Sequence, residues 1–114
     1  MTYWNIKLKE ATGIKQWLVK GNHDHQSFGW YMEHGWDFVG DYVKLHYGGK
    51  DIVFSHEPLR VEDIFPMDIN IHGHFHNNNH RIDKEVGASY NPKINKLLAI
   101  ENTNYQPVKL ESFL

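Results

Sequence analysis

Short apolar runs separated by polar turns make up much of this chain. The runs at 16–20, 51–55 and 68–72 are rich in β-branched and aromatic residues and are too short for typical helices. Each is followed directly by glycine, serine or histidine rather than by a further apolar turn of helix. The pattern therefore predicts three buried strands.

Apolar and polar positions alternate over 41–47, and Gly48-Gly49 leads from there into the strand predicted at 51–55. Two alternating segments joined by such a pair are typical of a β-hairpin. Two more strands are predicted over 85–90 and 96–101, with a proline-containing turn at 91–93 between them.

A helix is predicted over 25–34, because large apolar residues recur there at i, i+3 and i+4 and Gly35 follows as a stop. A weaker amphipathic pattern covers 1–10, and 108–114 is expected to be a short helical or irregular tail. Strands mixed with helices predict an α/β fold. The length of 114 residues fits one domain, 1–114.

Composition excludes several classes of function. The chain has no cysteine, which rules out disulfides, iron–sulfur clusters and thiol catalysis. A net charge of -2 argues against a basic nucleic-acid surface. No apolar run is long enough to span a bilayer and no signal peptide opens the chain, so we expect a cytoplasmic protein without membrane contact.

Histidines follow all three predicted buried strands. Gly21-Asn22-His23-Asp24 follows the first, His56 the second, and the run His72-Gly73-His74-Phe75-His76 begins at the end of the third. Ligands of α/β proteins lie at the carboxyl ends of strands, and neutral imidazole binds Zn, Fe, Mn or Ni. The three sets together predict a metal site at one edge of a sheet.

These motifs resemble the second half of the calcineurin-like metallophosphoesterases. Gly-Asn-His-Asp at 21–24, a histidine at 56 and Gly-His-Phe-His at 73–76 follow the family's order and spacing. Tyr90-Asn91 and the stretch 104–108 are similar to small bacterial and phage members. The resemblance covers about residue 8 to the C-terminus. It implies a β-sandwich flanked by helices, of which this chain would be a part, and hydrolysis of phosphate mono- or diesters.

The resemblance also implies a role for each motif residue. Asn22, His56 and His74 would bind one metal ion and His76 a second, with manganese favoured and iron, nickel or zinc alternatives. His23 would protonate the leaving group or bind the phosphoryl oxygen, and Asp24 would hold its imidazole. A hydroxide between the two ions would attack phosphorus.

The family's pattern begins with Asp-x-His and Gly-Asp, which supply further ligands and the bridging carboxylate. Neither occurs before Gly21, and Gly40-Asp41 comes too late in the order. We therefore expect the N-terminal strands of the family fold to be missing, at most one well-bound metal, and weak or absent hydrolysis. A second copy of the chain or a complementing N-terminal fragment is the expected partner, since exposed strand edges invite pairing.

Other readings stay open at this stage. The chain could be a catalytically impaired remnant that binds one transition metal or a partner chain, or a structural domain with incidental histidines. His72 is expected to be a hydrogen-bonding histidine beside the site, Glu57 a solvated charge, and Asp24 alternatively a helix cap. Surface positions are expected for the remaining histidines considered, which are His25, His34 and His46.

Overall fold

A computed structural model describes residues 11–60 and 67–114, which form two compact units, Met1–Asp41 and Tyr42–Leu114. Each unit is described by itself below. The amphipathic segment predicted over 1–10 lies outside the described residues, and the single domain expected for 1–114 stays a prediction. None of the helices in the described part of the chain has the length and apolarity needed to cross a bilayer.

The first unit is a short parallel strand pair packed with one helix. Strand β1, Trp17–Val19, pairs with β2, Phe38–Gly40, in the register Leu18↔Val39. Helix α2, Phe28–Glu33, connects them and places Tyr31 against Leu18 and Val39 in a small core. The strand predicted at 16–20 is thus confirmed, while β2 was not predicted.

Helix α2 is shorter than the predicted helix over 25–34. Its N-cap is Ser27, whose hydroxyl accepts a hydrogen bond from the Trp30 backbone N–H at 3.1 Å. Serine is a preferred N-cap because its side chain satisfies a backbone donor of the first turn. Asp24 is therefore not the cap of this helix, contrary to the alternative considered from sequence.

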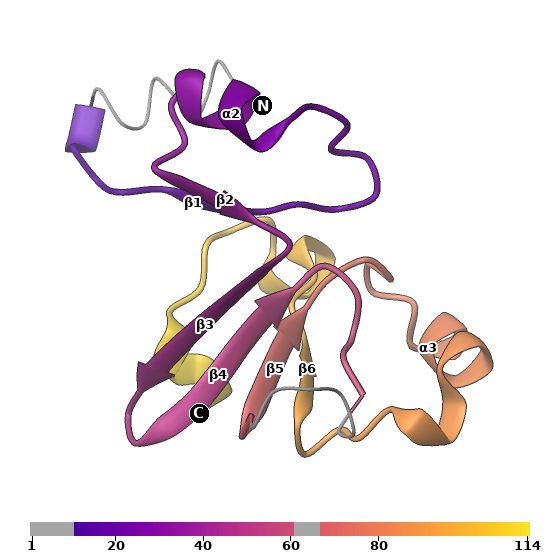
Figure 1. The fold of residues 1–114 in the computed structure, drawn as a ribbon. Helices are drawn as coiled ribbons and strands as arrows, with labels where there is room; N and C mark the ends of the chain where they lie inside the picture. The colour runs from indigo at the N-terminus through magenta and orange to yellow at the C-terminus, as the bar shows by residue number, and fades with distance from the viewer. Residues whose placement is uncertain (1–10, 61–66) are drawn as a thin grey trace. The chain divides into compact units, whose positions relative to one another are not determined.

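The second unit is built on a four-stranded sheet in the order β3-β4-β5-β6 (Figure 1). Strands β3, Tyr42–Tyr47, and β4, Lys50–Ser55, form the predicted antiparallel hairpin. Gly48 and Gly49 turn it at φ values of 61° and 75°, which glycine adopts without steric cost. Strand β5, Ile69–His72, confirms the strand predicted at 68–72 and pairs parallel to β4.

The chain between β5 and β6 is helical where a strand was predicted. Helix α3, Asn79–Glu85, is capped by the Asn78 side chain and buries Ile82, and the 3-10 turn η1, Gly87–Ser89, follows it. The strand predicted over 85–90 is therefore wrong. The asparagine cap and the helical pair Arg81–Glu85, at 2.8 Å, are local helix signals for a segment, 79–84, to which no element had been assigned from the sequence.

Strand β6, Asn95–Leu97, is shorter than the strand predicted over 96–101 and pairs parallel to β5. The chain then leaves the sheet through the 3-10 turn η2, Ile100–Thr103. The tail ends in η3, Leu110–Phe113, which agrees with the short helical tail expected there. The described residues thus form a mixed α/β fold with two sheets and few helices.

Apolar side chains and one amide network hold the central strands of this sheet together. Ile52, Ile69 and Ile71 form the buried core, and Leu110 and Phe113 of the tail pack against it. Asn70 on the central strand β5 is fully buried. Its Nδ2 group donates to the Val53 carbonyl at 3.1 Å and to the Ser55 hydroxyl at 2.9 Å on β4.

The same side chain also binds the opposite neighbour of β5. The Asn70 Oδ1 atom accepts hydrogen bonds from the Leu59 N–H at 2.9 Å and from the Asn95 Nδ2 group of β6 at 3.0 Å. Both donors and both acceptor positions of the amide are therefore used. A buried polar group satisfied in this way adds specificity to the strand order without a desolvation penalty.

Replacing Asn70 with alanine should destabilise the protein strongly. The change leaves several buried groups of β4, β6 and the Leu59 loop without partners, and each unsatisfied group costs about 1–3 kcal/mol. We expect the free energy of unfolding in urea to fall by about 3 kcal/mol or more. The exposed Asn102→Ala serves as the matched control and should change it by less than about 0.5 kcal/mol. Equal effects of the two changes would contradict this account of the sheet.

Candidate metal centre

Three parallel strands deliver the histidine loops of the second unit to one edge of the sheet. Ser55 at the end of β4 pairs with His72 of β5, which pairs with Leu97 of β6. The edge is tied further by hydrogen bonds from the Gly73 N–H to the His56 carbonyl at 2.9 Å and from the Leu98 N–H to the His72 carbonyl at 2.8 Å. Residues that leave these strands therefore meet at their carboxyl ends.

His56 and His74 face each other at this edge. The His56 Nε2 and His74 Nδ1 atoms lie 3.0 Å apart, and the two rings are inclined at 75°. Two imidazole nitrogens bound to one ion at about 2.0–2.1 Å, at a right angle, are also separated by about 3 Å. The pair thus has the nitrogen separation that a shared transition-metal ion requires. In this structure the same contact is a hydrogen bond.

The loop that carries the second and third motif histidines has an uncommon backbone. His74 and His76 have φ values of 71° and 53°, in the left-handed region. Gly73, which precedes His74, is not in this region. Left-handed conformations at non-glycine residues cost of order 1–3 kcal/mol and gather at functional sites. The strain therefore lies on the two histidines expected to bind metal.

A carboxylate lies near one ring nitrogen of each of these two histidines. The His74 Nε2 atom is 3.5 Å from Glu57 Oε1, and the His76 Nδ1 atom is 3.2 Å from Glu101 Oε2. The Glu57 side chain is 68% exposed, as expected for a solvated charge, whereas the Glu101 side chain is only 21% exposed. Metal-binding histidines commonly bind a carboxylate through the nitrogen that does not face the metal.

His72 is a buried, fully hydrogen-bonded histidine beside this group. Its Nδ1 atom lies 3.0 Å from the Gly73 carbonyl and its Nε2 atom 2.8 Å from the Tyr90 hydroxyl. A carbonyl only accepts, so Nδ1 carries the proton and Nε2 accepts from Tyr90. Burial lowers the pKa of His72, with smaller contributions in the same direction from His56 and His74. These contacts agree with the hydrogen-bonding role expected from sequence.

The residues Asn22, His23 and Asp24 lie in a turn of the first unit, after β1. The Asp24 carboxylate accepts a hydrogen bond from the Gly21 N–H at 2.8 Å, and the Asp24 N–H donates to the Gly21 carbonyl at 3.1 Å. Asp24 therefore closes the turn that presents His23. Its predicted role in holding the His23 imidazole stays a prediction.

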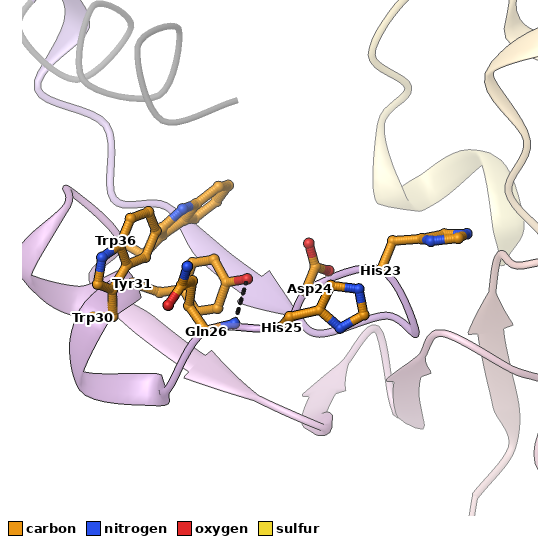
Figure 2. A pocket seen from close by; sticks show the side chains of 7 residues that line it. All are labelled: His23, Asp24, His25, Gln26, Trp30, Tyr31 and Trp36. Carbon is orange, nitrogen blue, oxygen red and sulfur yellow. Dashed lines mark hydrogen bonds between the residues drawn. The ribbon is translucent and has the colours of Figure 1, made fainter.

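A hollow of about 250 Å³ extends along this turn (Figure 2). Aromatic rings and the Gln26 side chain gather at one end, and His25, Asp24 and His23 follow each other at the other, with His23 pointing away from the rings. The Tyr31 hydroxyl accepts a hydrogen bond from the Gln26 N–H at 3.4 Å. The hollow is smaller than most small-molecule pockets, which are about 300–1,000 Å³.

The remaining histidines behave largely as expected from sequence. The His46 side chain on the hairpin is 70% exposed and lies 3.0 Å from the Asp51 carboxylate. His25 is exposed as well. His34 departs from the expectation, because it is half-buried and its ring stacks on Trp30 with centroids 3.9 Å apart.

Within the described residues, no cluster of three or more histidine, aspartate or glutamate side chains is arranged to hold a metal ion. The structure brings together His56 with His74, and His76 with Glu101, as two separate pairs. Sequence reasoning missed Glu101 and the Tyr90 contact. Glu101 was the last residue of the strand predicted over 96–101, so the rule that carboxyl ends of parallel strands share an edge could have placed it beside the histidines.

Comparison with known proteins gives a likeness in fold alone. No protein-family model and no curated protein sequence matches this chain. The solved structure of a protein of unknown function from Aquifex aeolicus is similar, with a TM-score of 0.57 and 23% sequence identity. The match covers 82% of this chain and 56% of that protein, so the chain spans little more than half its length.

The buried His72 should make the protein less stable in mild acid. Because burial lowers its pKa in the folded state, the unfolded chain binds the proton at higher pH than the folded protein does. Stability is therefore unaffected above the ordinary histidine pKa of about 6.5 and falls as the pH drops below it, by at most about 1.4 kcal/mol per pH unit.

The variant His72→Gln tests this pH dependence of stability, since glutamine keeps a polar side chain but does not titrate. We expect the free energy of unfolding to fall less between pH 7.5 and 5.5 in this variant than in the parent. His46→Gln, on the exposed hairpin, should retain the slope of the parent. A parent-like slope in His72→Gln would show that His72 is not responsible.

Proposed function

We propose that this protein is a metal-dependent phosphoesterase that hydrolyses phosphate mono- or diesters. The observation that supports this best is the pair His56–His74, with imidazole nitrogens 3.0 Å apart at the carboxyl edge of a parallel sheet. The motif resemblance supplies the reaction class, since a histidine pair alone is compatible with many metal sites. The strained backbone at His74 and His76 gives independent support for a functional loop.

The side chains present fit a transition-metal ion. The His56–His74 separation matches two ligands of one ion, and the carboxylate of Glu57 lies on the opposite side of the His74 ring, at 3.5 Å. Imidazole donors suit iron, nickel or zinc better than calcium or magnesium, and an oxygen donor shifts the preference toward manganese. A bound ion would supply a Lewis acid and an activated water at neutral pH.

The remaining roles in metal binding and proton transfer fall to side chains of this protein. In the proposal His56 and His74 hold the ion, Asn22 adds an oxygen donor, and His76 contributes a ligand for a second ion. His23 donates a proton to the leaving oxygen of the substrate, and Asp24 keeps the turn closed through its hydrogen bond to Gly21. The roles of Asn22 and His23 rest on the motif resemblance alone.

A second candidate function is binding of one transition-metal ion without turnover. It is favoured by the fact that the described residues include a pair of facing imidazoles but no acidic or histidine triad. Weak affinity and one ion per chain would distinguish this candidate from a two-metal hydrolase.

Metal binding and turnover should be measured together on the full chain. We expect titration calorimetry to detect manganese or zinc binding, and manganese-dependent hydrolysis of an aryl phosphodiester above the metal-only background. His56→Ala and His74→Ala should each weaken metal binding at least tenfold, because each removes one of two facing ligands. His23→Ala should retain the metal and lose most turnover, by about 10²-fold or more.

The control is His46→Ala, which removes an exposed hairpin histidine and should change neither quantity. Metal binding that survives both His56→Ala and His74→Ala would overturn the assigned site. Binding by the parent without any hydrolysis of phosphate mono- or diesters would support the metal-binding candidate instead of the hydrolase.

A further inference from the structure

Glu101 reaches the histidine edge from the third parallel strand. After β6 ends at Leu97, the Leu98 N–H donates to the His72 carbonyl at 2.8 Å, so the chain stays attached to the end of β5. Ala99 is buried, and the 3-10 turn η2 then carries Glu101. The backbone that leads to this carboxylate is thus attached to the sheet rather than to the loop that bears His76.

The contact between Glu101 and His76 defines which ring nitrogen is protonated. Glu101 Oε2 lies 3.2 Å from His76 Nδ1, and an ionised carboxylate can only accept a hydrogen bond. The proton therefore resides on Nδ1, and Nε2 keeps its lone pair. A histidine can bind a metal ion only through a nitrogen that carries a lone pair.

Burial indicates that the carboxylate orients the ring, and not the reverse. The His76 side chain is 74% exposed, so little else restrains it, whereas the Glu101 side chain is 21% exposed. The second carboxylate oxygen, Oε1, is buried and has no hydrogen-bond partner among the described residues. Glu57 makes a looser contact with His74, at 3.5 Å and with a largely exposed side chain.

We propose that Glu101 is a positioning residue, which holds His76 in the Nδ1–H tautomer and leaves Nε2 to bind a divalent transition-metal ion. The metal part of this proposal rests on the proposed function, whereas the tautomer does not. Outer carboxylates of this kind typically change metal affinity by about 10–100-fold when removed. Glu101 acts through His76 and is not itself a ligand.

The tautomer can be read directly in the metal-free protein. Two-bond ¹⁵N–¹H correlation spectra of the full chain at pH 8, where an ordinary imidazole is neutral, should give the Nδ1–H pattern for His76. Glu101→Ala should convert most of it to the Nε2–H pattern, and Glu101→Gln should retain Nδ1–H because its amide oxygen still accepts. Glu33→Ala, at the exposed end of α2, is the matched control. An Nε2–H pattern in the parent, or no change in Glu101→Ala, would overturn the proposal.

A zinc titration followed on the same signals tests the metal part. We expect the His76 Nε2 signal to shift, with the apparent Kd raised about tenfold or more in Glu101→Ala and less in Glu101→Gln. Zinc binding through Nδ1, or equal affinity in parent and Glu101→Ala, would overturn the positioning role. If no histidine responds to zinc, the proposed function fails, and the tautomer measurement still decides the Glu101–His76 contact.

Discussion

The parallel pairing of β4, β5 and β6 is the constraint on which the second unit depends. It is held by apolar packing around Ile52, Ile69 and Ile71 and by the buried amide of Asn70, which binds both neighbouring strands. Because the three strands run in one direction, whatever follows each of them emerges at the same edge. A chain of mostly short elements can therefore gather polar groups that lie far apart in sequence.

The geometry of that edge follows from the backbone before any side chain is considered. The Gly73 N–H and Leu98 N–H extend the ladder one step beyond β5 on both sides, so the loops after the strands start from fixed positions. His74 and His76 then adopt left-handed backbone conformations, which cost free energy at residues other than glycine. The stability of the sheet offsets this local strain. In these conformations the His74 imidazole lies against His56 and the His76 imidazole lies against Glu101.

Sequence patterns predicted the elements that have a continuous apolar run or a glycine turn. The Gly48-Gly49 hairpin and the buried strand before His72 had clear signals, and so did the meeting of His56 with His74. Helix α3 was not predicted, because its single buried residue, Ile82, gives no helical period, and the strand wrongly predicted over 85–90 overlaps it only at Glu85. The end of β6 at Leu97 was not predicted, because it depends on pairing with β5, a tertiary interaction that no local pattern records. The turn η2, which carries Glu101 to His76, was not predicted either.

In the proposed function, the His56–His74 contact would also set how a proton and a metal ion compete at this edge. As described, one proton lies between Nε2 of His56 and Nδ1 of His74, since two lone pairs at 3.0 Å would repel. A metal ion needs both lone pairs, so its binding must displace that proton and free the nitrogens. The carboxylate of Glu57 can hold a proton on the far nitrogen of His74 and so keep Nδ1 available. In the same proposal, Glu101 would hold a proton on Nδ1 of His76 and leave Nε2 available, from a position less exposed than that of Glu57.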